Sequence, residues 1–129
     1  MYKFNEFVFE NENTKNISVL IGILFQSRDI AHLVHLYTGS FAAHKALNEY
    51  YDGLLPLIDK IAEAYQGITG KMMITIPASS NQDILPHLTG LTRVINNVRT
   101  PKLEPEIAAL LDDVCELIST TLYKLKELK

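Results

Sequence analysis

The chain has little of what secreted, membrane-spanning or DNA-binding proteins need. Its single cysteine, Cys115, has no partner for an internal disulfide or a cysteine zinc site, which is typical of a reducing compartment. The longest apolar run, residues 17–25, is far shorter than the roughly 20 residues that cross a bilayer. The first residues also lack the basic start and apolar core of a signal peptide. We therefore expect a cytoplasmic protein, or one packaged in a particle assembled in a cytoplasm, with no membrane partner.

Positive charge is also scarce. Twelve lysines and arginines stand against 15 acidic residues, which gives a formal net charge of −3. Nonspecific DNA affinity comes from many basic contacts to phosphates. The charge balance therefore argues against DNA as a partner.

What the chain does have is apolar residues at helical spacing. With 129 residues, 47% of them apolar, it is long enough for one domain with a real core, and we expect residues 1–129 to form a single domain. Apolar residues that recur at threes and fours predict four helices. Their predicted ranges are 14–37, 41–67, 81–98 and 106–128, with Asn81 or Asp83 as the start of the third helix. Residues 1–13 alternate loosely and are either an extended arm or the start of the first helix.

The connections between these helices predict how they are wired. Turns are short at 38–40 and 100–105, whereas residues 68–80 form a long connection with no second strand to pair with. We expect an all-α four-helix bundle in which this connection crosses over between the second and third helices. Ferritin-like folds have that wiring.

The first predicted hairpin carries the residues with chemical potential. In antiparallel helices joined by a tight turn, residues equally distant from the turn lie level with each other. His35 lies just before the turn and His44 just after it, so their rings are expected to meet. His32 lies one turn further down its helix, on the face of His35.

Two carboxylates follow at the other end of the second helix. Asp59 and Glu63 are spaced i, i+4, and Asp59 lies roughly 22 Å along the helix from His44. A metal ligand must come within about 2 to 2.5 Å of the ion, so these residues cannot share one ion within a chain. Two chains packed antiparallel about a two-fold axis would bring the histidines of one to the carboxylates of the other. Mixed nitrogen and oxygen ligands suit iron, and also zinc or manganese.

The hairpin resembles a known family. Its order of helix, His, short turn, F-A-x-H, D-x-x-x-E and Gly, over residues 31–67, resembles the first hairpin of Dps proteins, the DNA-protecting mini-ferritins. The stretches HLYTGSFAAHKALNEYY and LDDVCELISTTLYKLK are similar to small Dps-like proteins of tailed phages. The resemblance implies a homo-oligomer, a dimer or a larger shell, with a ferroxidase site shared across the dimer. Its implied ligands are His35, His44, Asp59 and Glu63.

Two positions depart from the Dps pattern. Asn48 stands where Dps proteins usually have an aspartate, and it is a poorer iron ligand. The turn is also shorter by three residues if His35 is the first ligand, whereas His32 keeps the family spacing. Two functions follow: Fe(II) oxidation and storage, or a non-enzymatic structural or interaction protein, a phage accessory or virion-associated factor, that keeps the bundle without a working metal site.

Overall fold

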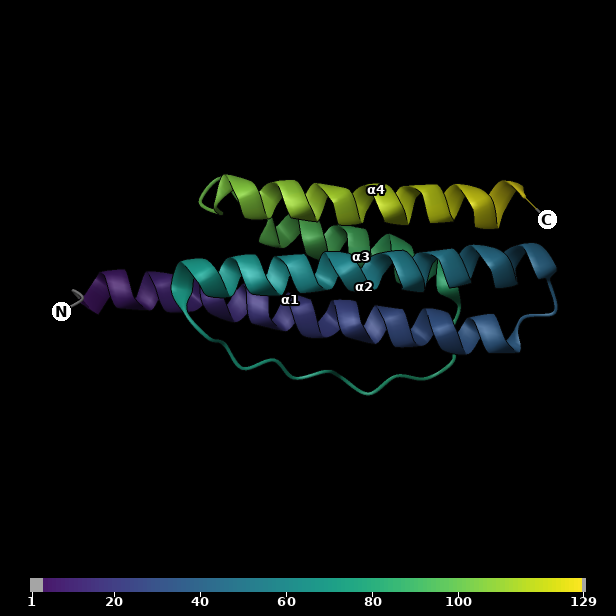
Figure 1. Ribbon diagram of the computed structural model, residues 1–129, viewed down its shortest axis with the longest axis horizontal. Coiled ribbons are helices and arrows are strands. Elements are labelled where there is room, and N and C mark those ends of the chain that lie inside the picture. The colour runs from purple at the N-terminus through teal and green to yellow at the C-terminus, as the bar shows by residue number, and fades with distance from the viewer. Residues whose placement is uncertain (1–3, 129) are drawn as a thin grey trace.

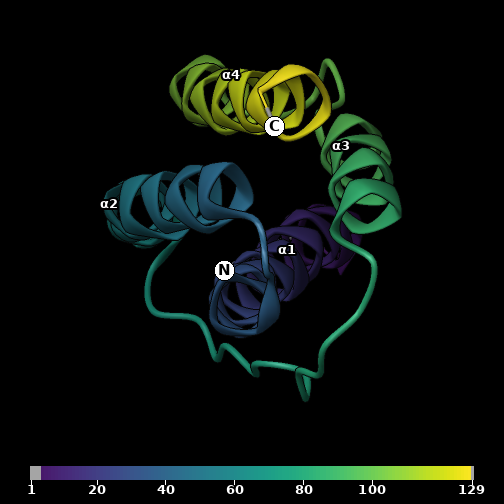
Figure 2. The same ribbon diagram turned by 90° about the vertical axis from the view of Figure 1, so that its right-hand side faces the viewer.

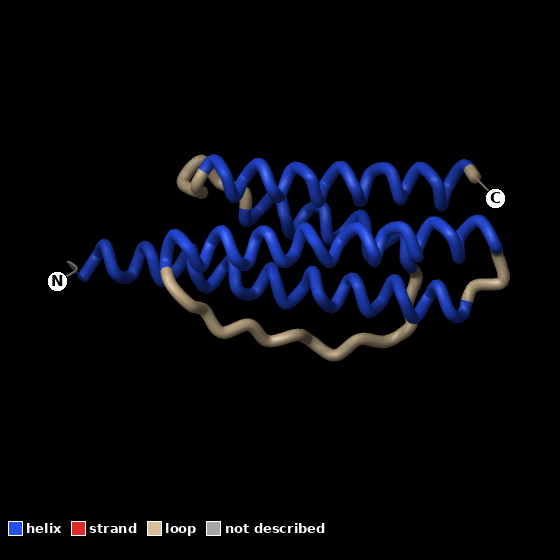
Figure 3. The backbone as a smooth tube through the Cα atoms, viewed as in Figure 1, coloured by secondary structure: helices blue, strands red, loops and turns tan. Residues whose placement is uncertain are grey.

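The computed structural model describes residues 4–128, with side chains from residue 13 onward (Figure 1). Four helices occur in this range: α1 (Phe4–Tyr37), α2 (Phe41–Thr69), α3 (Ile84–Val98) and α4 (Pro105–Glu127). The tube view in Figure 3 has helices and loops but no strand over the same residues. The prediction of an all-α protein with four helices is therefore confirmed.

The helices surround one shared core, as the end-on view in Figure 2 shows. Helix α1 packs against α2 and α3, and α4 packs against the same two, so α1 and α4 lie at opposite corners. Each helix contributes fully buried apolar side chains, among them Ile21, Leu54, Leu88 and Ile107. Burying such a side chain stabilises the fold by about 1.5 to 3 kcal/mol, which holds the four helices together.

The first helix begins earlier than the sequence predicts. Helix α1 starts at Phe4 rather than at Thr14. Of the two alternatives for residues 1–13, the helical one therefore holds from Phe4 onward, and residues 1–3 lie outside the described chain. In Figure 1 this added length carries α1 beyond the other helices at its N-terminal end.

The second helix ends later than predicted. Gly67 was expected to stop it, but α2 continues to Thr69 and stops at Gly70, whose φ of 95° suits glycine. The Gly70 N–H donates to the carbonyl of Gln66, which satisfies one of the last carbonyls of the helix. Helix α3 starts after Asp83, at the later of the two predicted positions, and α4 starts at Pro105, one residue before the predicted start.

A connection of irregular backbone, residues 70–83, joins α2 to α3. Figures 1 and 2 show it running along the bundle on the outer side of α1. A side chain at Gly22 would overlap the carbonyl oxygen of Thr75, so glycine allows the connection to lie directly on the helix. Gln26 of α1 also donates from Nε2 to the carbonyl of Ala78, at 2.9 Å. The connection is thus attached to α1.

One segment of the described chain, Asn13–Tyr37, is long and apolar enough to cross a membrane by length and composition alone. The sequence analysis counted only its uninterrupted apolar run and therefore missed this property. In the bundle, Leu20, Ile21 and Leu24 of this segment are buried in the shared core. A core helix of a bundle has the same apolar pattern.

Candidate functional site

The turn between α1 and α2 positions the two histidines that spacing singled out. The last turn of α1 is closed by a bond from the Thr38 N–H to the Val34 carbonyl, at 2.8 Å. Ser40 caps α2, since its hydroxyl accepts a hydrogen bond from the Ala43 N–H. This tight connection places His35 and His44 at the same level.

His35 and His44 are joined by three contacts. Their rings stack with centroids 3.6 Å apart and planes 21° from parallel. Nδ1 of His35 lies 2.6 Å from the His44 carbonyl oxygen, and Nδ1 of His44 lies 2.9 Å from the His35 carbonyl oxygen. A carbonyl oxygen only accepts, so both Nδ1 atoms carry the hydrogen. The pair joins α1 to α2. His35 is largely buried there, with 7% of its surface exposed.

His32 and Asn48, the two weaker ligand candidates, contact other residues of the same chain. The His32 ring stacks on Tyr51, with centroids 4.3 Å apart. The Tyr51 hydroxyl donates to Oδ1 of Asn48 at 2.6 Å, and Nδ2 of Asn48 donates to a carboxylate oxygen of Asp52 at 3.0 Å. Asn48 is therefore held by two residues of its own helix.

The predicted carboxylates lie away from this cluster. Asp59 and Glu63 are exposed on α2, and the helical rise puts Asp59 roughly 22 Å from His44. Within the part of the chain that the structure describes, no three His, Cys, Asp or Glu residues are grouped so that they could hold a metal ion. The four-ligand set of His35, His44, Asp59 and Glu63 therefore stays a prediction about two chains.

The stack limits what the histidine pair can do with a metal. An imidazole binds an ion in the plane of its ring, about 2.0 to 2.1 Å from the nitrogen. Two nearly parallel rings with centroids 3.6 Å apart do not direct their lone pairs at one ion. With both Nδ1 atoms donating to carbonyls, only the two Nε2 atoms are left as metal ligands. In this conformation the pair joins α1 to α2 and does not chelate a metal ion.

A second polar cluster, which the sequence analysis did not find, lies inside the bundle. Ser27 of α1 lies 2.7 Å from the Tyr50 hydroxyl of α2 and 2.8 Å from Nε2 of His87 in α3. Ser27 and Tyr50 are fully buried. Burial raises the pKa of Tyr50, partly offset by its hydrogen bond to Ser27, and burial lowers the pKa of His87.

This cluster holds three helices together. Because Ser27 is wholly inside, no substrate reaches its hydroxyl, and the cluster satisfies polar atoms that burial would otherwise leave unpaired. The only signal in the sequence is a serine within the apolar pattern of the first helix.

The end of the bundle that contains the turn, here called the tip, is apolar and exposed. Leu36, Tyr37 and Phe41, the tip cluster, are 69%, 80% and 80% exposed. Beside them is a groove of about 420 Å³, the tip groove, between the start of α2 and the end of α4. Apart from two alanines of α2, its walls are Phe41, Lys45, Glu49, Lys124 and Leu128.

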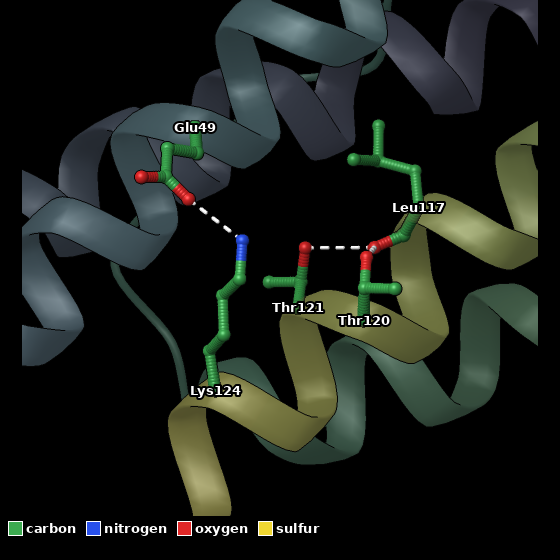
Figure 4. A network of polar contacts seen from close by, with 5 residues as sticks. All are labelled: Glu49, Leu117, Thr120, Thr121 and Lys124. Carbon is green, nitrogen blue, oxygen red and sulfur yellow. Dashed lines mark hydrogen bonds and ion pairs between the residues drawn. The ribbon is translucent and has the colours of Figure 1, made fainter. Parts of the chain in front are cut away.

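An ion pair forms part of the groove. Figure 4 shows Lys124 reaching from α4 to Glu49 on α2, with 2.7 Å between Nζ and the carboxylate oxygen. The Lys124 hydrogen bond and charge, together with the charge of Lys45, hold the pKa of Glu49 below its usual value. Exposed pairs of this kind contribute little to stability. The pair's main consequence is that the groove has one charged wall.

The architecture defines a small all-α protein of four helices over the described residues. The chain belongs to DUF5856, a family of unknown function whose profile matches residues 35–125. A relative in Enterobacteria phage T4, an uncharacterized 14.6 kDa protein in the mobD-ri intergenic region, is 29% identical over 126 residues, which cover 95% of this chain and 97% of the relative. No solved structure matches the chain at a significant level.

These matches correct the resemblance to Dps proteins and other mini-ferritins, which was wrong. The matching family covers residues 35–125, which include both histidines and all of α2, and it is not a ferritin or Dps family. The reason for the error is that the shared motif is mainly hairpin geometry. A tight turn brings any two equally spaced histidines together, and here they bond to each other's backbone.

Proposed function

We propose that this chain is a non-enzymatic structural or interaction protein of a phage, and that it acts by associating with further copies of itself through the tip. The observation that carries the proposal is the exposed tip cluster of Leu36, Tyr37 and Phe41. Soluble proteins that act as single chains rarely expose contiguous apolar patches of substantial size. Aromatic residues are also enriched where proteins bind each other.

The phage setting rests on the T4 relative, which spans nearly the whole chain. A protein of this kind acts in the host cytoplasm or in the virion. For the architecture, we propose the wiring expected from the sequence, two hairpins joined by a crossover as in ferritin-like folds. The long connection between α2 and α3 and the short turns elsewhere support it.

The rival function is iron binding by a pair of chains, with His35 and His44 facing Asp59 and Glu63 of a second copy, and with zinc or manganese as alternative ions. It needs the stacked rings to separate, because as they lie they do not chelate one ion. In addition, the side chain of Asn48 is already hydrogen-bonded to Tyr51 and Asp52. We therefore prefer the non-enzymatic proposal.

Self-association is tested by light scattering coupled to gel filtration over a range of concentrations. We expect the wild-type mass to rise above 14.6 kDa as concentration increases. A Tyr37→Ser, Phe41→Ser double variant should weaken association at least tenfold, since interface aromatics are typical hot spots worth about 1 to 2 kcal/mol or more.

The matched control is Met73→Ser, which removes a side chain that is 91% exposed but lies in the connection 70–83. It should associate like the wild type. A wild-type protein that stays at 14.6 kDa at every concentration would overturn the proposal.

A further inference from the structure

The beginning of α1 and the tip groove are complementary parts at opposite ends of the molecule. We propose that the first turns of α1 in one copy, residues 4–12, dock in the tip groove of a second copy. This inference rests on the proposed self-association and names the two surfaces that meet. The occupant of the groove is thus a segment of the same chain.

The groove has the size and lining to hold apolar side chains of a short helix. Its volume of about 420 Å³ lies within the range of about 300 to 1,000 Å³ that is usual for ligand pockets. It follows α2 from Phe41 to Glu49, a distance of about 12 Å at 1.5 Å per residue. Leu128, half exposed at the end of α4, forms the apolar wall opposite Phe41.

The charge of the groove favours an acidic occupant. Lys45 and Lys124 line it together with a single acidic residue, Glu49. Lys124 already neutralises Glu49 through the ion pair drawn in Figure 4. One positive charge therefore remains in excess at the groove, and Lys126 adds another in the same last turn of α4.

The start of α1 has the matching composition. Its sequence, FNEFVFENE over residues 4–12, contains three phenylalanines, one valine and three glutamates, and no basic residue. Nine residues of helix are about 13 Å long, close to the length of the groove. In Figures 1 and 3, this part of α1 extends past the ends of the neighbouring helices. It is thus placed to reach another molecule.

The placement of the two surfaces also decides how copies meet. The start of α1, residues 4–12, is here called the extension. It lies at one end of the bundle, and the turn between α1 and α2 lies at the other (Figure 1). Two chains side by side and antiparallel can therefore each place an extension in the other's groove. Such a pair is closed by a two-fold axis and leaves neither surface free.

A charge-swap experiment tests the inference on the full chain, with sedimentation velocity as the readout and circular dichroism as the check on folding. Lys45→Glu alone, or Glu6→Lys with Glu10→Lys alone, should weaken association at least tenfold. Combining all three substitutions should restore it to within about threefold of the wild type, because like charges are again replaced by opposite ones.

The control is Lys60→Glu, which makes the same charge change at an exposed position further along α2 and should leave association unchanged. If Lys45→Glu behaves like this control, or if the combined variant is not rescued while Tyr37→Ser, Phe41→Ser still weakens association, the docking inference fails and self-association through the tip stands. A wild-type chain that never associates would instead remove the proposed function as well.

Discussion

His35 and His44 hold the end of one helix to the start of the next, each through a hydrogen bond to the other's backbone. Their separation from the turn was enough to predict that the rings meet. It was not enough to predict the stack, because ring orientation depends on where the neighbouring carbonyl groups lie. Because the rings are stacked, the two histidines do not bind one metal ion together.

The bundle changes the environment of His87. Its Nε2 lies 2.8 Å from the buried Ser27 hydroxyl, and burial lowers the pKa of its imidazole. Nothing near it in the sequence indicates a partner, since Ser27 lies 60 residues away. The neutral form of His87 is therefore part of the folded state.

The protein should lose stability in mild acid because of this residue. With a lowered pKa in the folded chain, the unfolded chain binds more protons below the ordinary value of 6.5. Stability is therefore complete above about pH 6.5 and decreases as pH falls through the folded pKa. We expect the midpoint of urea unfolding to fall between about pH 7 and about pH 5, and to fall less in His87→Gln.

The control for this measurement is His32→Gln, which changes an exposed histidine. It should keep the full wild-type dependence on pH. Equal losses in His87→Gln and the wild type would contradict the assignment of the effect to His87.

At the scale of elements, the connection 70–83 and α1 depend on each other. The connection has no regular structure of its own. It lies along α1 because Gly22 leaves room for its backbone and Gln26 donates a hydrogen bond to it. The sequence predicted a loop there from its glycines and proline and from the lack of a partner strand. It did not indicate which helix would carry the loop, because that depends on the packing of all four.

Two glycine substitutions test this contact. Gly22→Ala should lower the free energy of unfolding by about 1 to 3 kcal/mol, because the new methyl group meets the Thr75 carbonyl and displaces the connection. Gly67→Ala should raise it by about 0.5 to 1 kcal/mol, because this helical position has open space around it and alanine favours helix. Urea unfolding of both variants beside the wild type measures the difference. Two changes of the same sign would contradict the contact.

For the whole molecule, the decisive fact is that the hairpin separates its chemical groups. His35 and His44 lie at the tip, whereas Asp59 and Glu63 are exposed further along α2. Only a second chain can bring these groups together. The assembly, rather than the single chain, therefore decides between the interaction protein that we propose and the iron-binding rival.

An iron titration separates the two functions. We expect anaerobic addition of Fe(II), followed by oxygen, to give an oxidation rate no higher than that of buffer, because the stacked rings do not chelate one ion. His44→Ala combined with Glu63→Ala should oxidise iron at the same rate and assemble normally. A wild-type rate above buffer that this double variant loses would favour the rival instead.

Local periodicity determined most of the architecture. The end of α1 and, to within a few residues, the starts of α2, α3 and α4 follow from apolar spacing, which acts over a few residues. The early start of α1 and the continuation of α2 to Thr69 escaped prediction because weak local signals near helix ends do not set boundaries reliably. Hairpin spacing likewise gave the level of His35 and His44.

Tertiary structure alone decided what these residues do. The buried cluster of Ser27, Tyr50 and His87 and the tip groove between α2 and α4 join parts far apart in the sequence. The stacking of His35 on His44 crosses the turn between two helices. Such contacts depend on the relative rotation and depth of packed helices, which no short stretch of sequence encodes. A spacing pattern therefore gave the position of the histidines, and only the packed bundle showed that they fasten two helices.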